Sequence, residues 1–217
     1  MSFLEVYKPT LICKALGLEG FETDTLINAS DEAIRVLFLP SFHPEACVTV
    51  SRVGSDADLQ FTGFIGEQLW HTKGTRNIPT FHATRRLSHE DFDNFWKHSK
   101  GIWAARQAQK YCVLTDGMRC AFVIKESEKL NVLEENVYAP GTGRELASLC
   151  LTLCWKLFDD DECCARLRNL GAYVNLNFPT KATKPSKPRK RIAVFGSSDD
   201  SNDLRQLIDG GSANIQS

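Results

Sequence analysis

The sequence predicts an α+β fold in which an antiparallel sheet of roughly five to seven strands is packed by two or three helices. Two β-rich runs, residues 33–39 and 47–53, flank a turn at residues 40–45, as expected for an antiparallel pair. Asp116-Gly117 separates two further β-rich runs, and this dipeptide favours a two-residue hairpin turn. Apolar residues between 142 and 158 recur at three- and four-residue spacings, which predicts a helix with one face on the sheet.

The amino-terminal part is expected to contain one short helix and four strands. The helix is predicted at residues 9–18, where Gly17 and Gly20 end it. The strands are predicted where apolar and β-branched residues concentrate, at residues 33–39, 47–53, 59–65 and 78–86. Residues 66–77 form a longer polar connection.

A helix is expected to begin after Ser88. Ser88 is a favourable N-cap residue, and Asp91 occupies the third helical position, where its carboxylate favours the helix start. One face of this helix carries three large aromatic residues, Phe92, Phe95 and Trp96. That stripe indicates core packing, and a second short helix is expected at residues 102–109.

The Asp116-Gly117 turn is predicted to join strands at residues 111–115 and 118–124, and residues 131–138 form a further strand. The long helix is expected to open with a capping box made by Thr142 and Glu145. Its apolar face carries Leu146, Leu149, Cys150, Leu153 and Leu157. Trp155 lies roughly opposite Leu146 by helical phase, so it either packs under another element or marks a contact surface.

The acidic run at residues 159–162 is expected to begin a shorter helix that Gly171 ends, and residues 173–178 are a candidate last strand. Residues 179–191 are a Pro/Lys/Arg linker that is too polar to fold alone. We therefore expect a single domain at residues 1–178, followed by a basic linker and a loosely attached tail at residues 179–217.

The cysteine content and the chain ends indicate the compartment. The eight cysteines are scattered among apolar positions without paired C-x-x-C spacing, which favours reduced, buried thiols over disulfides or zinc ligands. No apolar run approaches the roughly 20 residues of a membrane span, and the first residues do not form a signal peptide. We expect a cytoplasmic protein without membrane contact, metal or cofactor.

Catalytic motifs are not evident, and no catalytic residue is assigned. The sequence contains no Walker loop, dinucleotide fingerprint or G-x-S-x-G elbow. One alternative is a small hydrolase-like enzyme in which His43 and Glu45, from one turn, act as acid and base, with His82 brought near by folding. This alternative predicts a concave pocket in which these side chains converge.

Charge is distributed unevenly along the chain. Residues 1–180 contain 19 basic and 23 acidic side chains, whereas residues 181–191 contain six basic side chains and no acidic one. A basic segment of this kind either solubilises the chain or contacts phosphates, as in a nucleic-acid-associated regulator. The residues for that alternative are Lys184, Lys187, Arg189, Lys190 and Arg191.

The acidic run has two interpretations, a solvated helix start or an electrostatic contact for a basic partner. For the second interpretation, the candidate partner-binding residues are Asp159, Asp160, Asp161, Glu162 and Trp155. Acidic groups would steer the partner and the aromatic residue would supply affinity.

The order of elements resembles that of bacterial toxin-immunity proteins and related uncharacterised cytosolic proteins. The matching parts are the strand pair across residues 39–42, the aromatic helix at residues 92–96, the Thr115-Asp116-Gly117 hairpin, and Tyr138-Ala139-Pro140 before the long helix. The resemblance spans residues 33–158 and implies a module that occludes a toxin's active site. The leading hypothesis is therefore a non-enzymatic bacterial protein that neutralises a partner protein, a basic toxin domain.

Overall fold

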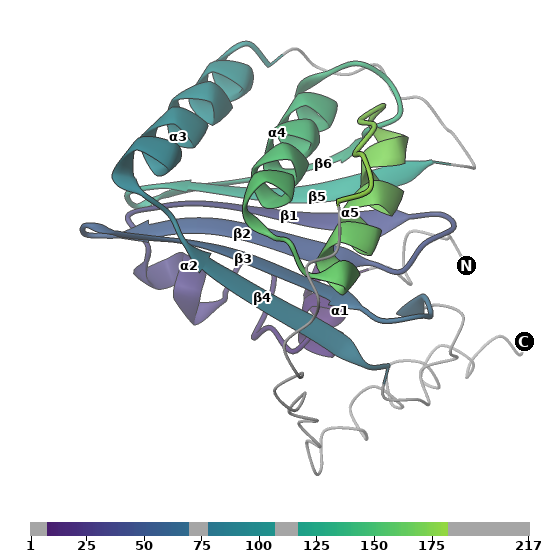
Figure 1. Ribbon diagram of the computed structural model, residues 1–217. Helices are drawn as coiled ribbons and strands as arrows, with labels where there is room; N and C mark the ends of the chain where they lie inside the picture. The colour runs from purple at the N-terminus through teal and green to yellow at the C-terminus, as the bar shows by residue number, and fades with distance from the viewer. Residues whose placement is uncertain (1–7, 70–77, 107–116, 182–217) are drawn as a thin grey trace, which may run out of the picture.

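The computed structural model describes residues 8–69, 78–106 and 117–181 (Figure 1). Six strands form one antiparallel sheet in the order β4-β3-β2-β1-β5-β6, so the predicted α+β class is confirmed. The strands are β1 (Glu32–Pro40), β2 (Ala46–Val53), β3 (Asp56–Phe64), β4 (Thr80–Arg86), β5 (Met118–Glu126) and β6 (Lys129–Asn136). The four predicted amino-terminal strands correspond to β1 to β4.

Helices cover both faces of the sheet (Figure 1). Three long helices, α3 (His89–Ala104), α4 (Thr142–Leu157) and α5 (Asp161–Tyr173), pack on one face. Two short helices, α1 (Pro9–Ala15) and α2 (Thr25–Ala29), cover the other. Within the described ranges, no helix combines the length and apolar character needed to cross a membrane.

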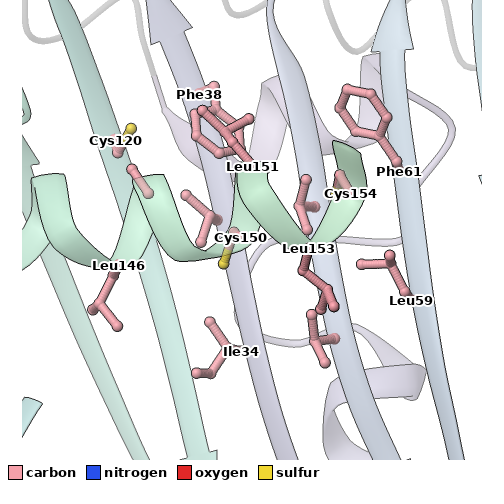
Figure 2. Close-up of a cluster of buried hydrophobic side chains, with 14 of the residues drawn as sticks. Ile34, Phe38, Leu59, Phe61, Cys120, Leu146, Cys150, Leu151, Leu153 and Cys154 are labelled. Atoms are coloured by element: carbon pink, nitrogen blue, oxygen red, sulfur yellow. The ribbon is translucent and has the colours of Figure 1, made fainter. Parts of the chain in front are cut away.

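The two-sided packing explains why β1 is apolar almost throughout. Ile34 and Val36 belong to the core under α3, α4 and α5, whereas Ala33 and Leu37 belong to the core under α1. Successive side chains of a strand point to opposite faces, so a central strand with two covered faces buries nearly every residue. Figure 2 shows the larger core, where α4 places Cys150 and Leu153 over β1 and β3.

Buried thiols are part of both cores. Cys13, Cys47, Cys120, Cys150, Cys154, Cys163 and Cys164 are free and buried, as expected from their apolar positions. The eighth cysteine, Cys112, lies outside the described residues. Burial raises the pKa of Cys150 and Cys154, so these thiols stay protonated and behave as small apolar side chains.

Helix α3 begins as predicted but extends further. The Ser88 Oγ accepts a hydrogen bond from the Asp91 N–H at 3.1 Å, and Phe92, Phe95 and Trp96 are buried. Of the separate helix predicted at residues 102–109, residues 102–104 belong to α3, which runs without a break through Gly101 to Ala104, and residues 107–109 lie outside the described ranges. Glycine weakens a helix by about 1 kcal/mol but does not end it where the flanking turns are packed.

The hairpin predicted at Asp116-Gly117 is wrong. Residues 107–116 lie outside the described ranges, but both edges of β5 are occupied, by β1 along Met118–Glu126 and by β6 along Arg119–Glu126. The hairpin instead joins β5 to β6 through Ser127 and Glu128, and Ser127 has a φ of 53°. Asp-Gly is a strong local signal, but the pairing of a strand is decided by which edges other strands occupy.

The predicted capping box of α4 is also wrong. Gly141 is the N-cap residue and Thr142 is the first residue of the helix, so the Thr142 side chain makes no cap. The Glu135 carboxylate of β6 accepts the Gly143 N–H at 2.6 Å, and a carboxylate at a helix N-terminus is favourable. A β-carbon at Gly143 would approach the Glu135 carboxylate to 2.6 Å, so only glycine fits this contact.

The chain after α5 packs back on the domain as an irregular segment. The strand predicted at residues 173–178 is wrong, because Tyr173 is the last residue of α5 and residues 174–178 form no strand. Gly171 lies inside α5, where the Phe178 ring passes 2.8 Å from the position of a β-carbon. Lys181 donates hydrogen bonds to the carbonyl oxygens of Trp155 and Phe158 at the end of α4. The described part of this segment therefore packs on the domain as far as Lys181.

Candidate functional site

The acidic run lies at the start of α5. The Asp160 side chain caps the helix by accepting the Cys163 N–H at 2.9 Å. Asp159 lies 3.8 Å from the Arg85 guanidinium, and Glu162 lies 3.9 Å from Arg166. Asp161 is exposed in the first turn. The arrangement matches the interpretation as a solvated helix start, and Asp159 and Asp161 also remain accessible to a basic partner.

Trp155 packs under another segment. Its ring stacks on Phe178 with a centroid distance of 4.7 Å, and the Lys181 ammonium lies 4.5 Å from the same ring. Trp155 is therefore half-buried between the end of α4 and the segment after α5.

The candidate nucleic-acid-binding residues, Lys184, Lys187, Arg189, Lys190 and Arg191, lie outside the described residues. Lys181, the nearest described lysine, caps the end of α4. A truncation that tests the basic segment should therefore retain Lys181, because removing it would also weaken the fold.

His43 and Glu45 do not form an acid–base pair. The Glu45 carboxylate is buried and accepts the Leu69 N–H at 3.0 Å, and burial raises its pKa. The His43 Nδ1 lies 2.9 Å from the Tyr173 hydroxyl. His82, on β4, contacts Thr62 and Thr80 instead. Among the described residues, no hydrogen bond joins any two of these three groups, so the convergence expected for an enzyme is not found.

Arg166 of α5 links the His43 turn and the end of β3 to the helix layer. Its guanidinium donates hydrogen bonds to the carbonyl oxygens of Pro44, at 3.1 Å, and Phe64. Its positive charge also lowers the pKa of His43, after the larger effect of burial. Arg166 is buried, so it fixes the turn on α5 rather than contacting solvent.

Two exposed aromatic side chains lie at the end of the sheet where β1 turns into β2. Phe42 is 68% exposed and Tyr138 is 61% exposed, the highest values among the large apolar residues described. Ser41 and Gly117 exchange hydrogen bonds, and the Tyr138 Cβ lies 3.7 Å from the β-carbon position of Gly117. Contacts through Ser41 and Gly117 therefore connect the backbone at Phe42 to the backbone at Tyr138 at this end of the sheet.

The backbone around each exposed ring is held by a side chain from a helix. The Phe42 N–H donates to the Tyr173 hydroxyl at 3.2 Å. Arg144 of α4 donates to the carbonyl oxygens of Tyr138, at 3.1 Å, and Val174, at 3.3 Å. We call the group Phe42, His43, Tyr138, Arg144 and Tyr173 the sheet-end surface.

Sequence reasoning treated Phe42 and Tyr138 as turn and strand-end residues and assigned them no role. The sequence contains a feature that could have identified them as exposed, because each is a large aromatic residue within two positions of proline in a polar turn. Such a residue cannot reach the core from a tight turn unless the turn folds inward.

The hollow found in the structure lies elsewhere. It has a volume of about 350 Å³ and is lined by Arg168, Ala172, Asn175, Leu176, Asn177 and Phe178. None of the predicted catalytic side chains contributes to it. Within the described ranges, no group of three potential metal-ligating side chains comes together either.

The chain matches no protein-family model, and comparisons with curated protein sequences and with solved structures gave no significant match. Function is therefore argued from the geometry of this chain alone.

Two histidines predict a small loss of stability on acidification, because His43 is half-buried and His82 remains exposed on β4. Partial desolvation lowers the pKa of His43 and His82 below 6.5, so the unfolded chain binds protons more readily than the folded protein below this value. The free energy of unfolding should then fall as the pH decreases through 6.5. Urea denaturation at several pH values measures this slope.

His82→Gln isolates the effect of one histidine. Glutamine can still bond to Thr62 but does not titrate, so the variant should lose less stability than the parent between pH 7 and 5.5. Glu45 has the opposite effect on the pH dependence of stability, because its raised pKa favours protonation of the folded form. This effect is the same in both proteins. An identical slope in the two proteins would contradict the assignment to His82.

Proposed function

We propose that this protein is a non-enzymatic binding protein that engages a partner protein through the sheet-end surface. The observation that supports this most directly is the position of its two most exposed aromatic side chains. Phe42 and Tyr138 lie at the same end of the sheet, and both rings stand on constrained backbone. Isolated exposed apolar residues need no explanation, but two exposed aromatic residues at one end of a sheet are typical of a contact surface.

Aromatic side chains favour binding through a small loss of conformational entropy as well as through the area that they bury. Aromatic side chains bury a large area while few torsions become ordered, which is why tyrosine and other aromatic residues are enriched at interfaces. The contacts from Tyr173 and Arg144 already fix the backbone of the two rings, so less conformational entropy is lost on binding. His43 and Arg144 add polar groups beside the rings for specificity.

The hydrolase-like alternative has less support. His43 and Glu45 bond to different partners, and His82 lies on β4 with two threonine contacts. A general base needs a partner that orients it next to a substrate position, and this geometry offers His43 only a tyrosine hydroxyl.

We extend the proposal to the neutralisation of a basic toxin domain. The excess of acidic over basic side chains in residues 1–180 supports it, since a negatively charged body attracts a basic partner. The acids of residues 159–162 would act by steering, because the α5 start lies about 18 Å along the helix from Tyr173. Replacing these four acids with serine should slow association and leave dissociation nearly unchanged.

The surface can be tested by site-specific photocrosslinking in the native cells. The photoreactive amino acid p-benzoylphenylalanine replaces Phe42 in one variant and Tyr138 in a second. A third variant carries it at Val53, which is 47% exposed at the opposite end of β2 and serves as the matched control. We expect one protein to crosslink at positions 42 and 138 and not at 53.

The captured partner then allows a quantitative test. Phe42→Ala and Tyr138→Ala should each weaken its binding at least tenfold, the effect of losing an interface residue worth about 2 kcal/mol. Val53→Ala should bind like the parent protein. Equal crosslinking at all three positions, or unchanged affinity of both alanine variants, would contradict the proposed surface.

A further inference from the structure

A chain of polar side chains crosses the core under α1, on the sheet face opposite α3, α4 and α5. Arg35 on β1 lies opposite Thr49 on β2, and its Nε donates a hydrogen bond to the Thr49 Oγ1 at 3.0 Å. Because this oxygen accepts from Arg35, its own proton is available to a third group. Cys47 lies two residues before Thr49 on the same face of β2, and a hydrogen bond joins its thiol to the Thr49 hydroxyl.

The Cys47 thiol also contacts a second thiol, that of Cys13 on α1. A hydrogen bond joins the two sulfur atoms. Both side chains belong to the core between α1 and the sheet, where Cys47 is 2% exposed and Cys13 is 0% exposed. Two sulfur atoms that already contact each other need only a small movement to form a disulfide bond.

The surroundings favour the anionic form of Cys47. The hydrogen bond from the Cys13 thiol lowers the pKa of Cys47 against the effect of burial, and the Arg35 charge and the Thr49 bond act in the same direction. The same pairing raises the pKa of Cys13, so the pair loses its first proton at Cys47. Among the described cysteines, Cys47 alone has a lowered pKa, since burial raises the pKa of the thiols on the other face of the sheet.

Arg35 adds a buried positive charge to these surroundings. Its Nη1 forms an ion pair with Asp24 at 3.0 Å and donates to the Gly20 carbonyl oxygen at 2.7 Å. Its Nη2 is buried and has no hydrogen-bond partner within the described residues. A cation beside a thiol is typical of reactive cysteines, whereas a purely apolar environment leaves a thiol inert.

We propose that Cys13 and Cys47 are a redox-active pair, which a low-molecular-weight disulfide such as oxidised glutathione converts to a disulfide bond between α1 and β2. The Cys47 thiolate attacks one sulfur of the small disulfide, forms a mixed disulfide and releases one thiolate. Cys13 then loses its proton, attacks the Cys47 sulfur and releases the second thiolate. Two electrons pass to the small disulfide, which leaves as two thiols with the two protons of the pair.

Helix α1 controls access to the pair. Figure 1 shows α1 on the outside of the sheet, and the helix has only seven residues and no side-chain cap at its start. A short helix without a cap opens at a lower free energy than the whole domain. The reaction therefore proceeds in the folded protein through local opening of α1, and the product holds α1 on the sheet.

Mass spectrometry of the purified full chain tests the proposal. The reduced protein is incubated with oxidised glutathione at neutral pH, the remaining thiols are blocked with N-ethylmaleimide in denaturant, and the protein is digested with trypsin. Each cysteine of the pair lies in its own tryptic peptide, residues 1–14 and residues 36–52. We expect a disulfide between these two peptides as the main product. Cys150→Ser is the matched control, since it removes a buried thiol from the other face of the sheet and should give the same product at the parent's rate.

Three kinds of variant assign the roles within the pair. Cys13→Ser should accumulate the mixed disulfide at Cys47, because the second attack is lost, whereas Cys47→Ser should leave Cys13 unmodified. Thr49→Val should slow the reaction about threefold, the net effect of one pKa unit on the fraction of thiolate and on its nucleophilicity. Thr49→Ser keeps the hydroxyl and should react like the parent. Loosened packing in Thr49→Val would act in the opposite direction, because more frequent opening speeds the reaction.

Recovery of the two peptides without a disulfide between them, from folded parent protein, would overturn the proposal. So would a disulfide that forms only in urea, or oxidation that joins Cys13 to Cys47 no more often than it joins other cysteines. The inference is independent of the partner-binding proposal, since the purified chain is tested without any partner.

Discussion

Replacing Arg166 with methionine is expected to lower the free energy of unfolding by about 3–5 kcal/mol, the usual cost of removing one member of a buried charged network. Arg166 is 4% exposed, and its guanidinium donates to Pro44 and Phe64. Its charge also favours the ionised form of the buried Glu45 carboxylate. The variant leaves two carbonyl oxygens without a donor and Glu45 without its countercharge.

Two comparisons separate these effects in urea denaturation. Arg168→Met removes the same charge from the same helix, at a residue without hydrogen bonds or ion pairs in the described region, and should cost less than about 0.5 kcal/mol. Adding Glu45→Gln to Arg166→Met should recover part of the loss, because the carboxylate no longer carries an unpaired charge. A loss below 1 kcal/mol for Arg166→Met would contradict the role assigned to it.

The Arg166→Met variant also bears on the proposed function. Arg166 holds the turn that carries Phe42, so partner binding through Phe42 should weaken more than binding through Tyr138, which Arg144 holds. Crosslinking from positions 42 and 138 in the Arg166→Met background measures the two separately.

Replacing Arg35 with methionine is expected to have a similar effect, about 3–5 kcal/mol, on the opposite face of the sheet. Arg35 is fully buried on β1. It forms an ion pair with Asp24 at 3.0 Å, and it donates to the Thr49 hydroxyl at 3.0 Å and to the Gly20 carbonyl oxygen at 2.7 Å. The contacts attach the segment between α1 and α2 to the sheet, so the variant should also loosen these helices.

The double variant Arg35→Met with Asp24→Asn provides the control. Asparagine can still cap α2, where Asp24 accepts the Leu26 N–H at 2.9 Å, but it carries no charge. The double variant should therefore be more stable than Arg35→Met alone. Thermal and urea denaturation measure both, and hydrogen exchange should report faster exchange in α1 and α2. Equal stability of the single and double variants would rule out a charge contribution from Asp24.

Predictions from the sequence were correct where the structure depends on interactions between residues that are close together in the chain. The Ser88 cap of α3 depends on one hydroxyl and a nearby N–H. The alternation of residues 47–53 requires a strand, since a helix would scatter the same side chains over all its faces. The acidic residues before α5 predicted a helix start because their interaction with the helix dipole is local.

The signals failed where a distant residue competed with the local one. Asp116-Gly117 is a good turn, but β1 and β6 occupy both edges of β5. Thr142 is a favourable capping residue, but the carboxylate of Glu135 accepts a free N–H at the start of α4 instead. Glycine often ends a helix, but Gly171 lies inside α5, where the Phe178 ring packs against it because it has no side chain.

The sheet-end surface illustrates the same division. The sequence shows Phe42 and Tyr138 in polar turns 96 positions apart, and it offers no reason to connect them. The pairing of β1 with β5 and the bonds between Ser41 and Gly117 place both residues at the same end of the sheet. The acidic run, by contrast, is conspicuous in the sequence because its members are adjacent.

By itself, the sequence determined the α+β class, the four amino-terminal strands, the start of α3 and the buried state of the cysteines, because each depends on the periodicity or polarity of neighbouring residues. Only the tertiary structure decided the strand order, the cap of α4, the separation of His43 from Glu45 and the placement of Phe42 and Tyr138 at one end of the sheet. Each of these depends on contacts between residues far apart in the chain, where competition for an edge, a donor or a cavity selects among several locally acceptable arrangements.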